Sequence, residues 1–211
     1  MDNKNFIHNL RLPIIQAPMF IVSNARLVIA SSRAGIVGSS IAYHLTKMGA
    51  EVTVIERDQP AAHATGKSFA WINASYPKKP YSYHHLSQLS LLAYQKLETE
   101  IGIDVHWGGS LEWFASKENQ KMLAKEIEVQ QGYGVPIQMI SGEQAHELEP
   151  NVEFDKNASI AFSKLDGAVD AVGVVNKFLK KTINLGGQVL YPVTYKSLKV
   201  VGNKIAAVRT S

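Results

Sequence analysis

The fold is decided by residues 27–56, which read LVIASSRAGIVGSSIAYHLTKMGAEVTVIE. The apolar run Leu27–Ala30 precedes a polar turn that contains glycine, and apolar residues then recur at helical spacing as far as Met48. Val52–Ile55 follows as a run rich in β-branched side chains, which is typical of a buried strand. Strand, glycine turn, helix and strand form a βαβ unit, whose strands are almost always parallel. We therefore predict an α/β fold of the Rossmann type.

The turn of this unit carries most of a dinucleotide-binding fingerprint. The second and third glycines of the G-x-G-x-x-G pattern are present as Gly35 and Gly38, whereas Arg33 stands at the first position. The second glycine lets a pyrophosphate approach the backbone, and the third lets the helix pack closely on the strand. The amides at the start of the helix then face the phosphates. The residues assigned to this phosphate loop are Gly35, Ile36, Val37, Gly38 and Ser39.

An acidic residue completes the fingerprint at the end of the second strand. Glu56 lies about twenty residues after the loop, where a carboxylate accepts hydrogen bonds from the ribose hydroxyls of an adenosine. An acid here favours a free 2′-hydroxyl, so that FAD or NAD fits better than NADP. The alternative is that the two glycines serve only a tight turn and that Glu56 is a solvated strand end.

Composition excludes several classes of protein. The 211 residues have a net charge of +4 with no basic run, which argues against a nucleic-acid partner. The absence of cysteine removes disulfides, thiolate metal sites and cysteine nucleophiles. No apolar stretch is long enough to span a bilayer, and residues 1–10 do not resemble a secretory signal, so we expect a cytoplasmic protein.

The rest of the chain predicts an inserted α+β portion. Residues 83–101 have the pattern of an amphipathic helix with Leu86, Leu89, Leu92 and Leu97 near one face, and the adjacent pair His84-His85 is assigned to a surface face. Glu98 and Glu100 are expected to be solvated. Further expected elements are a strand at 110–115, helices at 117–131 and 172–185, a short helix capped by Ser141 and Gln144, a strand at 189–191, and two strands joined at 202–203.

Residues 34–211 resemble the N-terminal half of the D-amino-acid oxidase family of FAD-dependent oxidoreductases, which includes glycine and sarcosine oxidases. The stretches that carry the resemblance are AGIVGSS at 34–40, GAEVTVIER at 49–57, ATGKSFAWINA at 64–74 and DGAVD at 166–170. The resemblance implies FAD as cofactor and a small amine or amino acid as substrate, which loses hydride to the flavin. It implies that cofactor contacts come from Glu56, Arg57, Thr65, Gly66, Lys67, Ser68 and Val193.

The first 33 residues resemble a different family. Residues 10–19, LRLPIIQAPM, together with 23–30, are similar to the opening of nitronate monooxygenases, which are FMN-binding (β/α)₈ barrels. A junction within the phosphate loop accounts for Arg33 at a glycine position. Residues 27–30 then either supply the first strand of the βαβ unit or keep the helical conformation that the second family has there. The less favoured third function is an FMN-dependent nitronate monooxygenase.

These resemblances imply a division of the chain and an expectation of incompleteness. Residues 1–33 form the leader, 34–80 and 160–211 belong to an FAD-binding domain, and 81–159 belong to a substrate domain. The usual substrate-binding residues of the family lie beyond the point that matches Ser211, so we expect a truncated chain with no assignable catalytic residue and no metal ligands. The alternative function is a non-catalytic fused or truncated fragment. The oligomeric state is not predicted.

Overall fold

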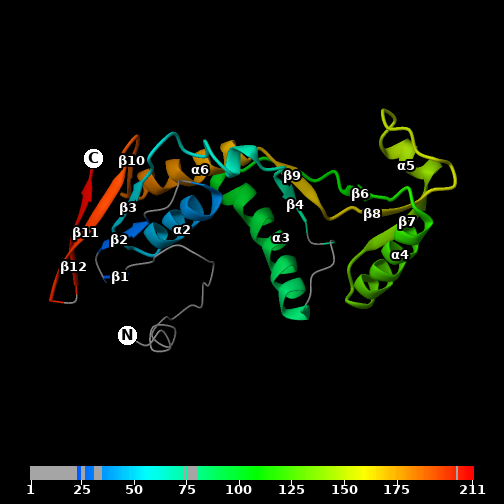
Figure 1. Cartoon of the computed structure of the whole chain (residues 1–211), viewed down its shortest axis with the longest axis horizontal. Coiled ribbons are helices and arrows are strands. Elements are labelled where there is room, and N and C mark those ends of the chain that lie inside the picture. The colour runs from blue at the N-terminus through cyan, green and yellow to red at the C-terminus, as the bar shows by residue number, and fades with distance from the viewer. Residues whose placement is uncertain (1–22, 25–26, 31–34, 74, 76–79, 203) are drawn as a thin grey trace.

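The computed structural model describes most of the chain and shows an elongated molecule (Figure 1). Within that part, no helix is both long enough and apolar enough to cross a membrane. Most of the leader (residues 1–33), including Arg33, lies outside the described residues. Only two short strands of the leader are described. The described residues are 23–24, 27–30, 35–73, 75, 80–202 and 204–211.

The predicted βαβ unit is present and forms part of a four-stranded sheet. Its strand order is β1-β2-β3-β10, in which β2, β3 and β10 are parallel and β1 is antiparallel. Leu27–Ala30 is therefore the first parallel strand, and the helical alternative for this segment is wrong. The strands of the sheet are β1 (Ser23–Asn24), β2 (Leu27–Ala30), β3 (Val52–Ile55) and β10 (Gln188–Leu190).

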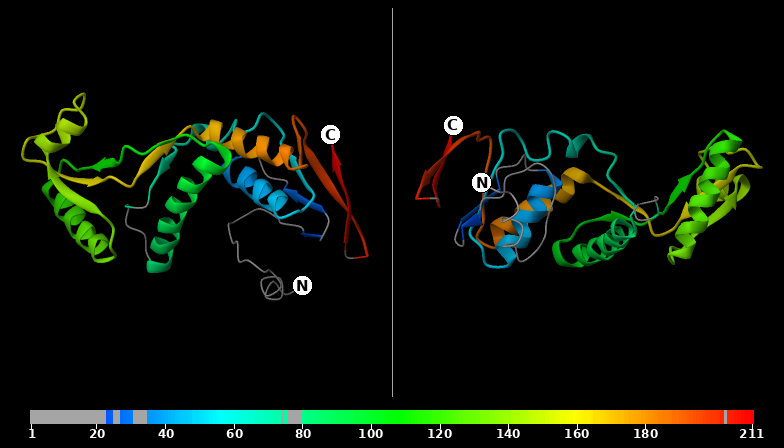
Figure 2. Two further views of the ribbon diagram at one scale, coloured as in Figure 1. Left: turned by 180° about the vertical axis from the view of Figure 1, so that it is seen from behind. Right: turned by 60° about the horizontal axis from the view of Figure 1, so that its bottom comes forward.

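Two helices pack together beside this sheet. Helices α2 (Ile36–Lys47) and α6 (Ala171–Asn184) run side by side in both views of Figure 2. The rings of Tyr43 and Phe178 join them, with centroids 5.6 Å apart. Asp170 caps α6 as predicted, because its Oδ1 accepts a hydrogen bond from the Val172 amide at 3.0 Å. The start of α6 is thereby placed directly after strand β9.

A small antiparallel sheet links the two ends of the molecule. Its strand order is β4-β9-β5, and its strands have only two or three residues each, so sequence periodicity did not show them. Leu97 and Ile101 of the long helix α3 pack against Val105 and Phe178 in one core cluster. The elements of this region are the 3₁₀ turn η1 (Thr65–Lys67), β4 (Trp71–Ile72), α3 (Tyr81–Ile101), β5 (Val105–His106) and β9 (Gly167–Val169).

The far end of the molecule is a separate layer of three strands and two helices (Figure 1). Leu123 and Ile127 of α4 pack on Ile137 and Ala161 of the sheet. The predicted capping box is confirmed, since Ser141 and Gln144 exchange hydrogen bonds. The elements are β6 (Ser110–Glu112), α4 (Lys117–Gly132), β7 (Ile137–Ser141), α5 (Gly142–Leu148) and β8 (Ser159–Ser163), with the hairpin β11 (Tyr195–Val201) and β12 (Lys204–Thr210) at the opposite end.

Two predictions about helix α3 are wrong. Of the four leucines assigned to one face, Leu97 is buried but Leu86, Leu89 and Leu92 are exposed, because α3 packs through Leu91, Leu97 and Ile101. His84 is only 3% exposed, since its ring packs on Tyr133, with centroids 5.1 Å apart. The buried face of α3 therefore does not include Leu86, Leu89 and Leu92.

The acidic end of α3 is also more engaged than expected. Glu98 accepts a hydrogen bond from the Trp107 indole at 2.7 Å, and Glu100 accepts one from the Tyr43 hydroxyl at 2.8 Å. Lys47 forms an ion pair with Glu100. Glu100 therefore joins α3 to α2, and Glu98 joins α3 to Trp107, which directly follows β5. Neither carboxylate is merely solvated.

Candidate functional site

The amino end of helix α2 is free of any cap from its own side chains. Gly35 is the N-cap residue with extended backbone (φ −89°, ψ −175°), and as glycine it offers no side chain to the first helical amides. The Ile36 amide donates instead to Thr65 Oγ1 at 3.2 Å. Amides at a helix start favour negatively charged groups, because they lack helical partners and lie at the positive end of the helix dipole. This end of α2 therefore suits a phosphate.

The residues that follow are placed by the packing of α2. Gly38 is buried, as expected for the glycine that permits close helix packing. Ser39 differs from its assignment as a cofactor contact. Its hydroxyl is fully buried and donates to the carbonyls of Gly35 and Ile36, at 2.9 and 3.1 Å. The Ser39 side chain is thus turned into its own helix, and Val37 remains half-buried in the first turn.

Glu56 lies at the carboxyl end of β3 and is 1% exposed. Its backbone joins the end of β10, because its amide donates to Leu190 O at 2.9 Å and its carbonyl accepts from the Val193 amide at 2.8 Å. Its side chain is held by the Asp58 amide, which donates to Oε1 at 2.8 Å. Val193 therefore lies beside Glu56, although the two residues are 137 positions apart in the sequence.

The segment that follows Glu56 folds over the start of α2. Thr65 and Gly66 belong to η1, and the Gly66 amide donates to Ala61 O at 2.9 Å. A β-carbon at Gly66 would come within 2.4 Å of that same oxygen, so only glycine fits this close backbone approach. Ser68 Oγ donates to Thr65 O at 2.8 Å, which closes the turn. Lys67 is exposed at this turn and makes none of these contacts.

Arg57 points to a neighbouring carboxylate. Its Nε donates to Asp58 Oδ2 at 3.0 Å, and His63 Nε2 lies 2.6 Å from the same oxygen. The hydrogen bonds from His63 and then Arg57 lower the pKa of the Asp58 carboxyl below its ordinary value. Arg57, Asp58 and His63 thus form a polar group beside Glu56.

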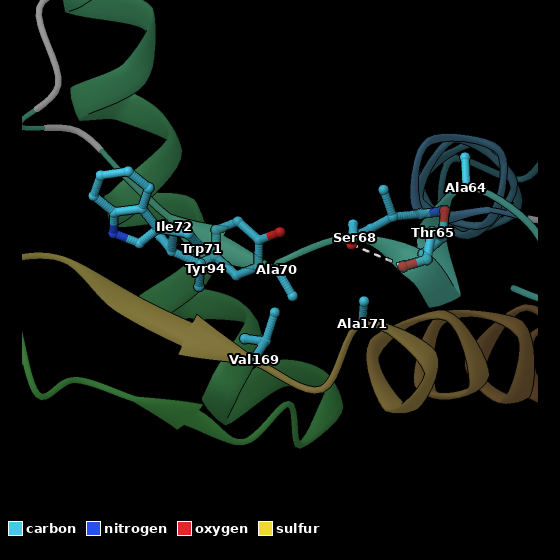
Figure 3. A pocket seen from close by; sticks show the side chains of 10 residues that line it. Ala64, Thr65, Ser68, Ala70, Trp71, Ile72, Tyr94, Val169 and Ala171 are labelled. Atoms are coloured by element: carbon cyan, nitrogen blue, oxygen red, sulfur yellow. Dashed lines mark hydrogen bonds between the residues drawn. The ribbon is translucent and has the colours of Figure 1, made fainter. Parts of the chain in front are cut away.

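A cavity of about 380 Å³ continues from the start of α2 to the small sheet. Figure 3 shows Thr65 and Ser68 at one side of it and the rings of Trp71 and Tyr94 at the other. Burial raises the pKa of the Tyr94 hydroxyl, which therefore stays protonated at neutral pH. Of the predicted site residues, Ile36, Thr65 and Ser68 line the cavity. The other lining residues are Ala64, Ala70, Trp71, Ile72, Tyr94, Val169 and Ala171.

Sequence reasoning missed most of the cavity wall. Tyr94 comes from the middle of α3, and Val169 and Ala171 from the junction of β9 and α6, so that residues far apart in the chain meet here. Trp71 is 38% exposed and lines the cavity. The only signal in the sequence was its place in the segment 64–74, which had already been singled out.

The described residues fit an FAD molecule in three respects. The start of α2 has no cap from its own N-cap residue and suits the pyrophosphate, and a buried carboxylate at the next strand end suits the ribose. The cavity beyond them has a largely apolar wall of the kind that accepts a planar ring system. The start of α2 and Glu56 lie at the carboxyl ends of neighbouring parallel strands, and the cavity extends from the start of α2 to the small antiparallel sheet.

Solved structures share this architecture. L-proline dehydrogenase from P. horikoshii superimposes with a TM-score of 0.77 at 26% identity, covering 90% of this chain and 50% of that one. Glycine oxidase from Bacillus cereus gives a TM-score of 0.78 at 19% identity, covering 89% of this chain and 52% of that one. The second likeness shows the fold alone.

Curated relatives agree with the structures. The chain is 28% identical to a glycine oxidase of Bacillus licheniformis, with 84% of this chain and 47% of that protein covered. It is 25% identical to a D-amino acid dehydrogenase of Azorhizobium caulinodans, with 84% of this chain and 56% of that protein covered. The chain thus spans about half the length of these relatives. Residues 34–211 match the FAD dependent oxidoreductase (DAO) family. The chain belongs to this family of FAD-dependent oxidoreductases.

Proposed function

We propose that this chain supplies the FAD-binding part of an oxidoreductase that acts on a small amine or amino acid. The family to which the chain belongs supports FAD as the cofactor. The names of the relatives, a glycine oxidase and a D-amino acid dehydrogenase, support an amino acid as the substrate class. When bound, FAD supplies a hydride acceptor for the carbon next to the substrate nitrogen.

The observation that carries the proposal is the pairing of the α2 start with the buried carboxylate of Glu56. Both lie at the carboxyl ends of neighbouring parallel strands, because α2 follows β2 along the chain and Glu56 directly follows β3. A buried carboxylate costs free energy unless it is well hydrogen-bonded, and one oxygen of Glu56 already accepts from the Asp58 amide. Ribose hydroxyls are donors that suit the same carboxylate.

Each part of the site has a distinct task in this proposal. The amides of Ile36 and Val37 and the hydroxyls of Thr65 and Ser68 bind the pyrophosphate, and the Val193 backbone contacts the adenine. The walls formed by Trp71, Ile72 and Val169 exclude water from the ring system. The proposed contacts are Gly35, Ile36, Val37, Gly38, Ser39 through its backbone, Glu56, Arg57, Thr65, Gly66, Lys67, Ser68 and Val193.

The division into domains follows from the same proposal. Residues 34–80 and 160–211 contribute the parallel strands β3 and β10 with helices α2 and α6, and we assign them to FAD binding. Residues 81–159 contain α3, α4, α5 and most of the outer sheet, and we assign them to the substrate side. The cavity lies where these two parts meet, since Tyr94 comes from one and Thr65 from the other.

The test compares two glutamates that flank the same strand. Glu56 is buried at the carboxyl end of β3, whereas Glu51 is exposed just before the strand begins. The purified protein should bind FAD, and E56Q should weaken binding by about 5- to 150-fold, which corresponds to about 1–3 kcal/mol for a buried charged hydrogen bond. E51Q keeps the charge change but should leave the FAD Kd within twofold.

Three outcomes would contradict the proposal. The first is a colourless protein that takes up no FAD on reconstitution. The second is an equal effect of E56Q and E51Q, which would show that net charge rather than the ribose contact matters. The third is FMN instead of FAD among the released cofactor, since this would favour the nitronate monooxygenase alternative.

A further inference from the structure

Three side chains beside the ribose site have the donor atoms of a metal centre. Glu56, Asp58 and His63 each offer one ligand atom, and these atoms all lie within 4.8 Å of one another. They come from one short segment, in which Glu56 directly follows β3 and His63 precedes η1. Glu56 is buried, and the other two side chains are half-buried, so the group opens to solvent on one side.

The closest pair in this group already shares a hydrogen. His63 Nε2 lies 2.6 Å from Asp58 Oδ2, so one proton lies between an imidazole nitrogen and a carboxylate oxygen. A divalent ion bound to both atoms would take the place of this proton, which would be released to solvent or held on Nδ1 of the same ring. Bonds of about 2.0–2.2 Å from zinc to nitrogen and oxygen require the two atoms to separate to about 3.3 Å in a tetrahedral arrangement. The half-buried side chains of Asp58 and His63 have room for this small movement.

The charge around the group favours a cation. Two carboxylates lie beside one imidazole in this group, and the Arg57 guanidinium lies against one of the carboxylates, with Nε 3.0 Å from Asp58 Oδ2. The Arg57 side chain is 51% exposed, so it can turn from Asp58 into solvent without losing hydration. One imidazole and two carboxylates form a donor set that suits zinc, with solvent completing the coordination.

We propose that Glu56, Asp58 and His63 form a binding site for a divalent transition-metal ion, best matched by Zn²⁺, and that the ion and FAD exclude one another. The exclusion follows because both ligands need the Glu56 carboxylate. This second part rests on the proposed function, whereas the metal site itself does not. The site makes cofactor loading sensitive to free metal, without any change in the phosphate loop.

The first experiment measures Zn²⁺ binding alone. Untagged full-length protein, stripped with EDTA and free of FAD, is titrated with zinc chloride by calorimetry at neutral pH. We expect one site in the wild type, and H63Q should weaken it by at least about tenfold, since an imidazole ligand is lost. His85 lies exposed on α3, away from this segment, so H85Q is the matched control and should bind like the wild type. Equal Zn²⁺ affinity in H63Q and the wild type would overturn the metal site.

The second experiment measures FAD binding with and without Zn²⁺. With free Zn²⁺ at ten times its own Kd, simple competition predicts that the apparent FAD Kd rises about elevenfold. H63Q should lose this effect while its FAD Kd in EDTA stays within about threefold of the wild type. An FAD Kd that Zn²⁺ leaves unchanged would overturn the exclusion. Failure to bind FAD in EDTA would instead refute the proposed function, and the calorimetric comparison would still decide the metal site.

Discussion

Replacing Gly66 by alanine tests the close backbone approach at the cofactor turn. The added β-carbon would lie 2.4 Å from Ala61 O, about 1 Å inside the shortest ordinary contact. Ala61 cannot yield easily, because its own backbone has φ 62° and its carbonyl accepts the Gly66 amide at 2.9 Å. The turn must therefore shift by about 1 Å, and overpacking of this kind costs about 1–3 kcal/mol.

The shift has a second consequence at the start of α2. Thr65 precedes Gly66 and accepts the Ile36 amide at 3.2 Å, so a displacement of about 1 Å breaks that hydrogen bond. We expect G66A to lower the melting temperature by roughly 2–4 °C per kcal/mol lost and to weaken FAD binding by at least about tenfold. Thermal unfolding followed by circular dichroism and FAD titration by fluorescence quenching measure the two effects.

The control for this substitution is another glycine with free space around it. A β-carbon at Gly108 meets nothing within 4 Å, and its φ is not positive, so G108A should match the wild type in both assays. The reasoning fails if G66A melts within 1 °C of the wild type and binds FAD with an unchanged Kd. It also fails if G108A is affected as strongly as G66A.

Three further predictions address stability and charge. Leu123 is 1% exposed in the outer core and Met122 is 57% exposed, so L123A should cost about 2–5 kcal/mol in urea unfolding and M122A less than about 0.5 kcal/mol. D170A removes the cap of α6 and should cost about 1 kcal/mol in the same assay, whereas an unchanged urea midpoint would show that the cap contributes nothing. The lowered pKa of Asp58 contributes stability above its unfolded pKa of about 3.9, and this is lost as pH falls through the lower folded value. Carboxyl NMR titration should show the Asp58 pKa rising toward its ordinary value in H63Q, and an unmoved pKa would contradict the assigned cause.

Local signals predicted the elements that they encode directly. The β-branched run that became β3 and the helix with a glycine on each side were visible because strand and helix periods differ. The caps at Ser141 and Asp170 were visible because a side chain there bonds an amide two or three residues away. Glu56 was found by its spacing from the loop, and the structure places it, buried, at the strand end.

Features that depend on distant segments were not visible. The buried face of α3 is chosen by Phe178 and Val105, which lie outside the helix, and so the exposed leucines were misassigned. His84 is buried by Tyr133 of the outer layer, a contact that no local pattern encodes. The cavity wall of Tyr94 and Val169 was missed for the same reason, since two elements far apart in sequence create it.

The pairing of β3 with β10 also determines when this sheet can be completed during translation. Thr53 lies opposite Gln188, so the strand that bears the ribose acid waits for a partner that is translated 135 residues later. At about 5–20 residues per second, the ribosome needs about 7–27 s to bridge that interval. The outer layer, which ends at Ser163, emerges complete before then, while one edge of β3 stays open. The nascent chain therefore completes this part of the cofactor site only after β10 has been translated, and until then the unpaired edge of β3 can pair with other strands.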